Sequence, residues 1–344
     1  MSLLPTFVGR CSVLAAVASA AGLCAPVAAQ TVLTLSSWVP PAHTLTTTQI
    51  EWCEMLAAKL PGKVKCTVLP RAVTAAPGTF DAVRNGLVDI SFTVHGYTPG
   101  RFVTTQMAEF PFLGNNSEPV SVAFQRVYAK TPAMAEEHKG VKVLAVFTHG
   151  PGIVFNTKRP VTKAEDLLGL KWRVGGGMVN EISKALGMNV TLKPAPESYE
   201  LLSTGVMDGT LFPAESVESF KIDKVIKYGT TFPGGLYNTS FVFMMNQAKY
   251  DALAPDVKKA VDELSGEMAA RMFGKAWDKV DRRGLAFMQA NGVQITKADA
   301  AFVKQVSDKT EPLVDAWAKL AEAKGMKEPK KALTAFRADI AKLQ

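Results

Sequence analysis

Short apolar runs alternate with amphipathic segments along the chain from Thr31 onward. Residues 32–36, 64–69 and 90–94 have the length and the apolar content of buried strands. Residues 46–60 carry apolar side chains at helical spacing and stop at Pro61-Gly62, a pair that ends helices. Because strands and helices alternate in this way, the pattern predicts an α/β fold in which helices connect the strands of a sheet.

Two segments, residues 80–89 and 199–208, share one layout. Each begins with an aromatic residue and an acid, continues as a helix to a glycine, and ends with an apolar pair and an aspartate before a strand. One copy in each half predicts two similar α/β lobes, with a ligand bound beyond the carboxyl ends of their strands. Chance recurrence of helix, glycine cap and strand is the alternative. Residues 241–246 predict a strand that returns to the first lobe, and residues 256–290 a long helix that can span both lobes.

The first 29 residues have a different character. Arg10 is their only charged residue, residues 11–27 are rich in Ala, Val and Leu, and Val27-Ala28-Ala29 offers the small side chains that a signal peptidase requires. We therefore predict export to the periplasm with cleavage near Ala29, a retained anchor being the alternative. No later stretch approaches the roughly 20 apolar residues of a membrane span.

Composition and charge narrow the classes of partner. The chain has 344 residues, enough for two domains, and a net charge of +8 that is spread along the sequence. Basic runs interleaved with aromatic residues are absent, so no nucleic-acid partner is expected, whereas a basic surface favours anionic ligands. Cys53 and Cys66 lie on the inward sides of a predicted helix and the next strand. An oxidising compartment favours a disulfide between them, and two buried free thiols are the alternative.

Candidate chemistry points to binding rather than catalysis. The sequence contains no Gly-x-Ser-x-Gly elbow, no His-Glu-x-x-His helix and no Walker loop, and its four histidines are too dispersed to predict a metal site. Arg173 ends a predicted strand, and Gly175-Gly176-Gly177 then opens a helix. Free N–H groups, the helix dipole and a planar guanidinium together suit a carboxylate. Pairing of Arg173 with a structural acid is the alternative, and Trp172, on the opposite face, is expected in the core.

The residues just described resemble those of a known family. The run from Asn156-Thr157-Lys158-Arg159-Pro160 to Leu170-Lys171-Trp172-Arg173-Val174, followed by Gly205, Asp208-Gly209 and Pro213, resembles the DctP-type solute-binding subunit of tripartite ATP-independent periplasmic (TRAP) transporters. Gly86-Leu87-Val88-Asp89 and Phe110-Pro111-Phe112-Leu113 match the first-domain pattern of the same family. The resemblance covers nearly all of the chain after the signal segment.

The resemblance implies a type II-like periplasmic-binding-protein clamshell with a long helix spanning both lobes. Lobe I would hold residues 30–152 and about 238–275, and lobe II residues 153–237 and about 276–344. The lobes would close on a carboxylate held by Arg173 and dock on the integral membrane subunits of the transporter. The chain departs from the family pattern at Phe212, where many relatives have Asn, and at Gly152, where sialic-acid-type relatives have a second arginine. Both departures disfavour a sugar acid.

We therefore predict a periplasmic protein that binds a small organic monocarboxylate, whether a hydroxy, an oxo or an aromatic acid, for secondary-active uptake. A C4-dicarboxylate or sugar-acid binder of the same family is the first alternative; a periplasmic enzyme and a structural scaffold are the others. The chain is expected to be a monomer without cofactor or metal. The predicted ligand-binding residues are Arg173, Phe212, Trp38, Tyr237, Asn238 and Gly175.

Overall fold

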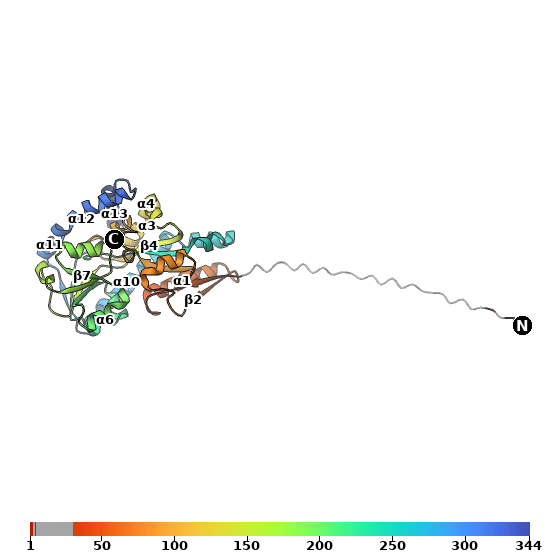
Figure 1. Cartoon of the computed structure of the whole chain (residues 1–344), viewed down its shortest axis with the longest axis horizontal. Coiled ribbons are helices and arrows are strands. Elements are labelled where there is room, and N and C mark those ends of the chain that lie inside the picture. The colour runs from red at the N-terminus through yellow and green to blue at the C-terminus, as the bar shows by residue number, and fades with distance from the viewer. Residues whose placement is uncertain (3, 5–29) are drawn as a thin grey trace.

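Two β-sheets carry the fold of the residues that the computed structural model describes, namely residues 1, 2, 4 and 30–344 (Figure 1). The predicted signal cleavage near Ala29 lies outside the described residues. The first sheet has the strand order β2-β1-β3-β10-β4, and the second has the order β11-β9-β5-β8-β6-β7. We call each sheet, with the helices packed on it, a lobe: lobe I holds the first sheet and lobe II the second.

The strands of lobe I are β1 (Thr31–Leu35), β2 (Val64–Val68), β3 (Ile90–Val94), β4 (Val141–Thr148) and β10 (Ser240–Asn246). Those of lobe II are β5 (Ile153–Asn156), β6 (Lys171–Val174), β7 (Asn189–Leu192), β8 (Gly209–Phe212), β9 (Tyr228–Thr231) and β11 (Gln294–Lys297). The predicted return strand is confirmed: β10 lies antiparallel between β3 and β4. Every residue of β3 and β10 is buried, as expected of central strands covered on both faces.

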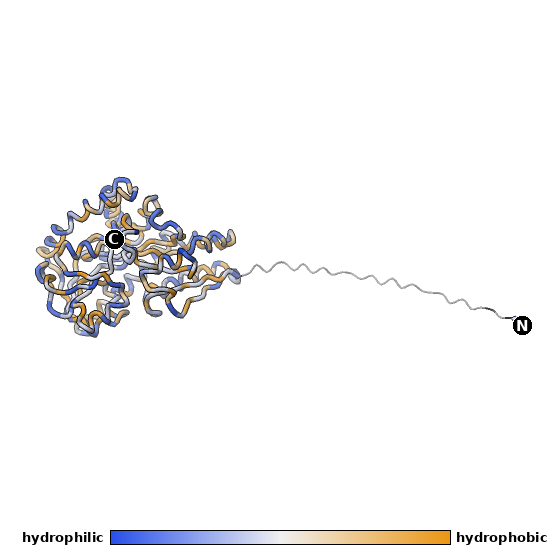
Figure 2. Tube along the Cα trace, in the orientation of Figure 1, coloured by the Kyte–Doolittle hydropathy of each residue, from blue (hydrophilic) through white to orange (hydrophobic). Residues whose placement is uncertain are grey.

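The helices are α1 (Thr44–Lys59), α2 (Thr79–Arg84), α3 (Ser117–Lys130), α4 (Pro132–Glu137), α5 (Met178–Ala185), α6 (Ser198–Ser203), α7 (Glu215–Ser219), α8 (Gln247–Asp251), α9 (Pro255–Glu263), α10 (Glu267–Ala290), α11 (Ala300–Thr310), α12 (Pro312–Ala323) and α13 (Pro329–Leu343). Apolar and polar residues alternate along the outer ones (Figure 2). The predicted α/β class and two-lobed architecture are confirmed. No helix of the described residues is long and apolar enough to cross a membrane.

The long helix α10 contacts both lobes, as predicted. Toward lobe I, the carboxylate of Asp278 accepts hydrogen bonds from the first N–H groups of α3. Toward lobe II, Asp281 Oδ1 accepts from the Glu215 N–H at 2.9 Å. Two glycines allow these approaches, because a Cβ on Gly274 would lie 2.5 Å from Glu118 and a Cβ on Gly284 would lie 2.5 Å from the Ala214 oxygen.

The helical run differs from the prediction in one respect. Residues 256–290 do not form one helix but belong to α9 and α10, which are separated near Gly266. Gly266 has φ 66°, a left-handed conformation that favours glycine, and its N–H donates to the Leu144 oxygen of β4. The chain therefore turns at Gly266 and starts α10 against the first sheet.

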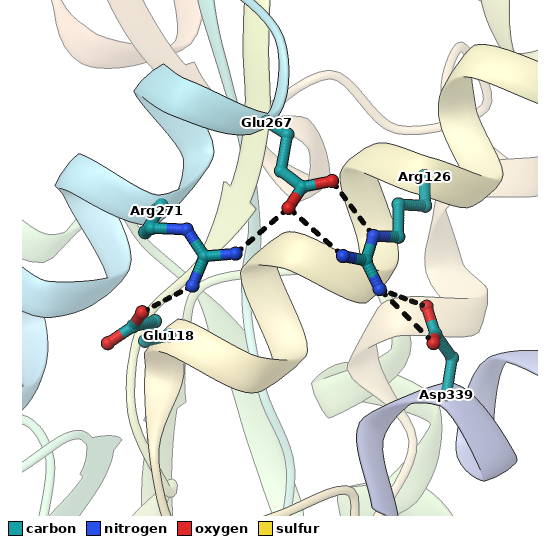
Figure 3. Close-up of polar contacts among 5 residues, drawn as sticks. All are labelled: Glu118, Arg126, Glu267, Arg271 and Asp339. Atoms are coloured by element: carbon teal, nitrogen blue, oxygen red, sulfur yellow. Dashed lines mark hydrogen bonds and ion pairs between the residues drawn. The ribbon is translucent and has the colours of Figure 1, made fainter. Parts of the chain in front are cut away.

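A network of ion pairs fixes the start of α10 to two other helices (Figure 3). Glu267 accepts from Arg126 of α3 at 2.8 and 3.0 Å and from Arg271 of α10 itself at 2.9 Å. Arg126 also donates to Asp339 of α13 at 3.3 Å, and Arg271 donates to Glu118 at 2.7 Å. Because α11 packs on α5 of lobe II while α13 packs on α3, the C-terminal helices join the lobes along one edge of the molecule (Figure 1).

A disulfide joins Cys53 of α1 to Cys66 of β2, with 6.1 Å between their Cα atoms. Of the two alternatives that the sequence left open, the structure has the bridge. It closes a short loop that contains the end of α1 and the turn at Gly62, so it ties a helix to the edge strand of the first sheet.

We expect the double substitution Cys53→Ala/Cys66→Ala to lower the free energy of unfolding by about 2–4 kcal/mol, because the bridge restricts the unfolded chain. Urea denaturation of the oxidised wild type, the reduced wild type and the double variant measures the effect. The reduced wild type and the variant should unfold at similar, lower urea concentrations. Coincident curves for all three samples would contradict a stabilising bridge.

Candidate functional site

A cavity lies between the two lobes, where several strands end. Trp38 and Tyr97 follow the ends of β1 and β3 in lobe I, and Arg173 and Phe212 stand at the ends of β6 and β8 in lobe II. The part of this space that can hold the centre of a water molecule measures about 50 Å³. The repeat in the sequence predicts this position, because strand ends in open α/β sheets face a common crevice.

The lobes touch each other beside this cavity. Gly96 follows β3 and Gly176 follows β6, and a Cβ on Gly96 would lie 2.6 Å from the carbonyl carbon of Gly176. The hydroxyl of Tyr97 accepts a hydrogen bond from the Ala195 N–H of lobe II at 2.8 Å. The structure therefore has the lobes closed against each other, with the two backbones in contact at these glycines.

Arg173 is the charged group of the cavity. Its side chain is 2 % exposed, and its Nε donates to the Lys193 oxygen at 2.8 Å. No carboxylate of the described residues lies within ion-pair distance of its guanidinium. Burial lowers the pKa of Arg173, while the nearby Tyr97 and Tyr237 act in the opposite direction. The structure thus holds a desolvated cation beside the Tyr97 hydroxyl and without a carboxylate partner among the described residues, whereas the alternative predicted a structural acid as its partner.

Aromatic rings form the walls around Arg173. The guanidinium carbon lies 4.6 Å from the centre of the Phe212 ring, a cation–π distance, and Phe212 in turn stacks on Phe220 at 5.5 Å. Trp38 contacts Tyr97 at 5.5 Å, and its indole N–H is fixed by the Phe92 oxygen at 2.8 Å. The cavity thus offers flat apolar surfaces beside one positive charge.

Tyr237 fills the space next to Gly152. Gly152 and Tyr237 are paired through the backbone, with the Gly152 N–H donating to the Tyr237 oxygen at 2.9 Å. Any Cβ on Gly152 would run into the Tyr237 ring. The departure from the sialic-acid-type pattern therefore has a physical reason: a tyrosine ring occupies the position that a longer side chain at 152 would need.

The predicted site residues come together with one exception. Arg173, Phe212, Trp38, Tyr237 and Gly175 all line the cavity. Asn238 does not line it; its amide nitrogen faces the carbonyl oxygens of His149 and Gly150 at 3.3 and 2.9 Å. Asn238 therefore holds the backbone behind the cavity wall.

The start of α5 also differs from the prediction. The sequence suggests that its free N–H groups receive the ligand anion, but the Met178 N–H donates to Glu109 Oε2 at 2.7 Å. Glu109 is buried, and its other oxygen accepts from the Ser240 hydroxyl at 2.6 Å. Burial raises the pKa of Glu109 to about 7. Gly177, with φ 75°, leaves room for this carboxylate, so Arg173 remains the cavity's group for an anion.

Tyr97, His149 and Glu109 are among the residues of this region that sequence reasoning missed. Tyr97 could have been found, because it follows a strand end as Arg173 does. His149 and Glu109 carry no local signal of their position. The sequence predicted dispersed histidines, but His95 and His138 are hydrogen-bonded to each other at 2.8 Å. Even so, no cluster of three or more potential metal ligands occurs in the described part of the chain.

Comparison with known proteins agrees with this geometry. Residues 35–320 match the family model described as bacterial extracellular solute-binding protein, family 7. The outer membrane transporter protein TsaT of Comamonas testosteroni is 30% identical over 311 residues, which are 90% of this chain and 91% of TsaT.

Two solved structures have the same fold. A TRAP periplasmic solute-binding protein from Bordetella bronchiseptica, with bound (R)- and (S)-mandelate, is 43% identical, with a TM-score of 0.88 over 91% of this chain and 100% of that one. A TRAP solute-binding protein from Rhodoferax ferrireducens, in complex with copurified benzoate, is 28% identical, with a TM-score of 0.85 over 91% and 98% of the two chains. Proteins of this kind bind ligands without converting them. This chain therefore belongs to the DctP family, the solute-binding proteins of TRAP transporters.

Proposed function

We propose that this protein captures an aromatic monocarboxylate in the periplasm, after cleavage near Ala29, and delivers it to the membrane subunits of a TRAP transporter. The observation that carries the proposal is the buried Arg173 guanidinium, which has no carboxylate partner in the described residues and faces a cavity walled by aromatic rings. A ligand carboxylate would neutralise this charge through two parallel hydrogen bonds. A planar ring would fit between the flat side chains.

The number of charges in the cavity supports a monocarboxylate. Arg173 is the single Lys or Arg among the residues that line it. A dicarboxylate would bury a second negative charge without a partner, which is costly in a desolvated site. A sugar acid would bring several hydroxyls against Phe212, Phe220 and Phe241, none of which can form hydrogen bonds with them. Both family alternatives are therefore disfavoured.

The solved relatives support the aromatic part of the proposal. The 43% identical protein was found with mandelate and the 28% identical protein with benzoate. Each of these acids has one carboxylate attached to, or one carbon away from, a phenyl ring. Such a ligand matches the proximity of Arg173 to Phe212 in this chain, where the guanidinium carbon lies 4.6 Å from the ring centre.

Arg173→Met tests the anchor. We expect the variant to lose affinity for mandelate and benzoate by about 30-fold or more, because a buried charge-assisted contact is worth about 2–5 kcal/mol. Its melting temperature without ligand should not fall, since the substitution removes an uncompensated buried cation. Arg173→Lys is the control that keeps the charge but not the planar fork, and it should restore affinity only in part. Titration calorimetry showing wild-type affinity in Arg173→Met would remove Arg173 from the site.

Phe212→Asn tests the aromatic wall. We expect about 10- to 100-fold weaker binding of aromatic acids, because the variant loses both ring contact with the ligand and the platform under Arg173. Phe212→Leu, which keeps the apolar volume, is the matched control and should lose less. A thermal-shift panel of aromatic acids, C4-dicarboxylates and sugar acids measures the ranking. If Phe212→Asn keeps the wild-type order of ligands, Phe212 does not determine specificity.

Ligand binding should also hold the lobes in their closed arrangement, because the ligand would contact side chains of both. Small-angle scattering is expected to give a smaller radius of gyration at saturating mandelate than without ligand. Arg173→Met at the same mandelate concentration is the control and should give the value of the free protein. Identical profiles for free and saturated wild type would contradict ligand-driven closure.

A further inference from the structure

Two histidines line the cavity, and their hydrogen bonds set their protonation states. His43 Nδ1 accepts from the Leu45 N–H at 3.1 Å, so this nitrogen carries no proton. Its Nε2 lies 3.4 Å from Glu215 Oε2. Nδ1 of His43 is therefore hydrogen-bonded within the protein, and Nε2 faces the Glu215 carboxyl group.

His149 has the opposite arrangement. Its Nδ1 contacts the Gly150 carbonyl oxygen, which has no proton to give, so Nδ1 must carry the proton. Burial lowers the pKa of His149 to about 4, so the ring is neutral near pH 7. A neutral imidazole protonated at Nδ1 presents a lone pair at Nε2. No residue that the structure describes forms a hydrogen bond with this Nε2, although His149 is 4 % exposed.

The position of this free acceptor is fixed by its surroundings. The His149 ring meets the Tyr237 ring edge-on at 5.3 Å and 89°, and it also contacts Trp277 at 6.0 Å. Its backbone N–H donates to the Thr239 oxygen at 3.3 Å, and its carbonyl receives the amide of Asn238. An acceptor held in this way is preorganised for a donor on the ligand.

Tyr237 connects His149 to the anion anchor. Its ring contacts His149, and its hydroxyl lies close enough to Arg173 for each to influence the pKa of the other. Arg173, Tyr237 and His149 thus follow one another around the same cavity. A ligand held by its carboxylate at Arg173 therefore shares the cavity with the His149 acceptor.

We infer that His149 Nε2 accepts a hydrogen bond from the 2-hydroxyl group of the ligand, so that the protein selects aromatic 2-hydroxy acids over their 2-oxo and unsubstituted analogues. This inference rests on the proposed function and adds the residue and the direction of the hydrogen bond. A hydroxyl can donate to the lone pair. A 2-oxo group has only lone pairs of its own, and a 2-methylene group leaves the buried nitrogen without a partner.

Three acids with the same skeleton test the inference: mandelate, phenylglyoxylate and phenylacetate. Titration calorimetry of the wild type should show that mandelate, in its preferred enantiomer, binds about 10- to 100-fold more tightly than either analogue, as expected of one buried hydrogen bond. Equal affinities for mandelate and phenylglyoxylate would overturn the inference and leave the proposed function standing. A wild type that binds none of the three acids would contradict the proposed function itself.

Two substitutions separate the two ring nitrogens of His149. In His149→Asn, the amide nitrogen can replace Nδ1 as donor to the Gly150 oxygen, but no acceptor remains at the position of Nε2. In His149→Gln, the longer side chain brings an acceptor oxygen close to the position of Nε2. We expect His149→Asn to bind the three acids within about threefold of one another. His149→Gln should retain part of the preference for mandelate.

The two variants also distinguish the loss of one hydrogen bond from the loss of the folded cavity. Measurable binding of phenylacetate by His149→Asn shows that the cavity still accepts an aromatic acid, so a lost preference for mandelate then supports the inference. A preference for mandelate that survives in His149→Asn overturns it. If His149→Asn fails to fold, the wild-type ranking of mandelate against phenylglyoxylate and the ranking in His149→Gln still decide the matter.

Discussion

The buried charge of Arg173 is the constraint on which the rest of the site depends. A guanidinium that is 2 % exposed and lacks a carboxylate partner in the described residues has lost most of its hydration without a compensating anion. The protein stabilises it only in part, through the Lys193 oxygen, the face of Phe212 and the nearby Tyr97. The missing interaction is the one a ligand supplies. Because the walls around this charge are apolar, an anion with few other polar groups is the ligand that leaves least unsatisfied.

The connection between the lobes determines how firmly this charge is enclosed. Helix α10 contacts both lobes through Asp278 and Asp281, and the ion pairs of Glu267 fix its first turn to α3 and α13 (Figure 3). Those ion pairs are partly exposed, so each contributes little by itself. Their value lies in joining three helices that are remote in sequence. Contacts across the cleft include the hydrogen bond from Ala195 to Tyr97, the hydrogen bond from Met178 to Glu109, and His43 facing Glu215.

Local features of the sequence predicted the fold and part of the site. Alternating strands and helices indicated the α/β class, and Arg173 was assigned to the site from its place near a strand end, whereas Phe212 was assigned to it through the family resemblance. Features that depend on contacts between distant segments escaped prediction. The helix start at Met178 looked free because Glu109, its partner, lies 69 positions earlier. Likewise, nothing in the sequence indicates which ring nitrogen carries the proton in His43 or in His149. The backbone atom beside each Nδ1 determines it.

The contact between Gly96 and Gly176 has a consequence for the rate at which the ligand dissociates. At this point the two backbones already touch, since a Cβ on Gly96 would fall 2.6 Å from Gly176, so the lobes meet on this side of the cavity. Separation of the lobes would widen the way out for a molecule bound there. Its residence time is then governed by the opening rate of the protein as well as by its own contacts. Substitutions at interlobe positions that never touch the ligand would therefore change the dissociation rate, and a partner that pulls the lobes apart would release the ligand without competing for Arg173.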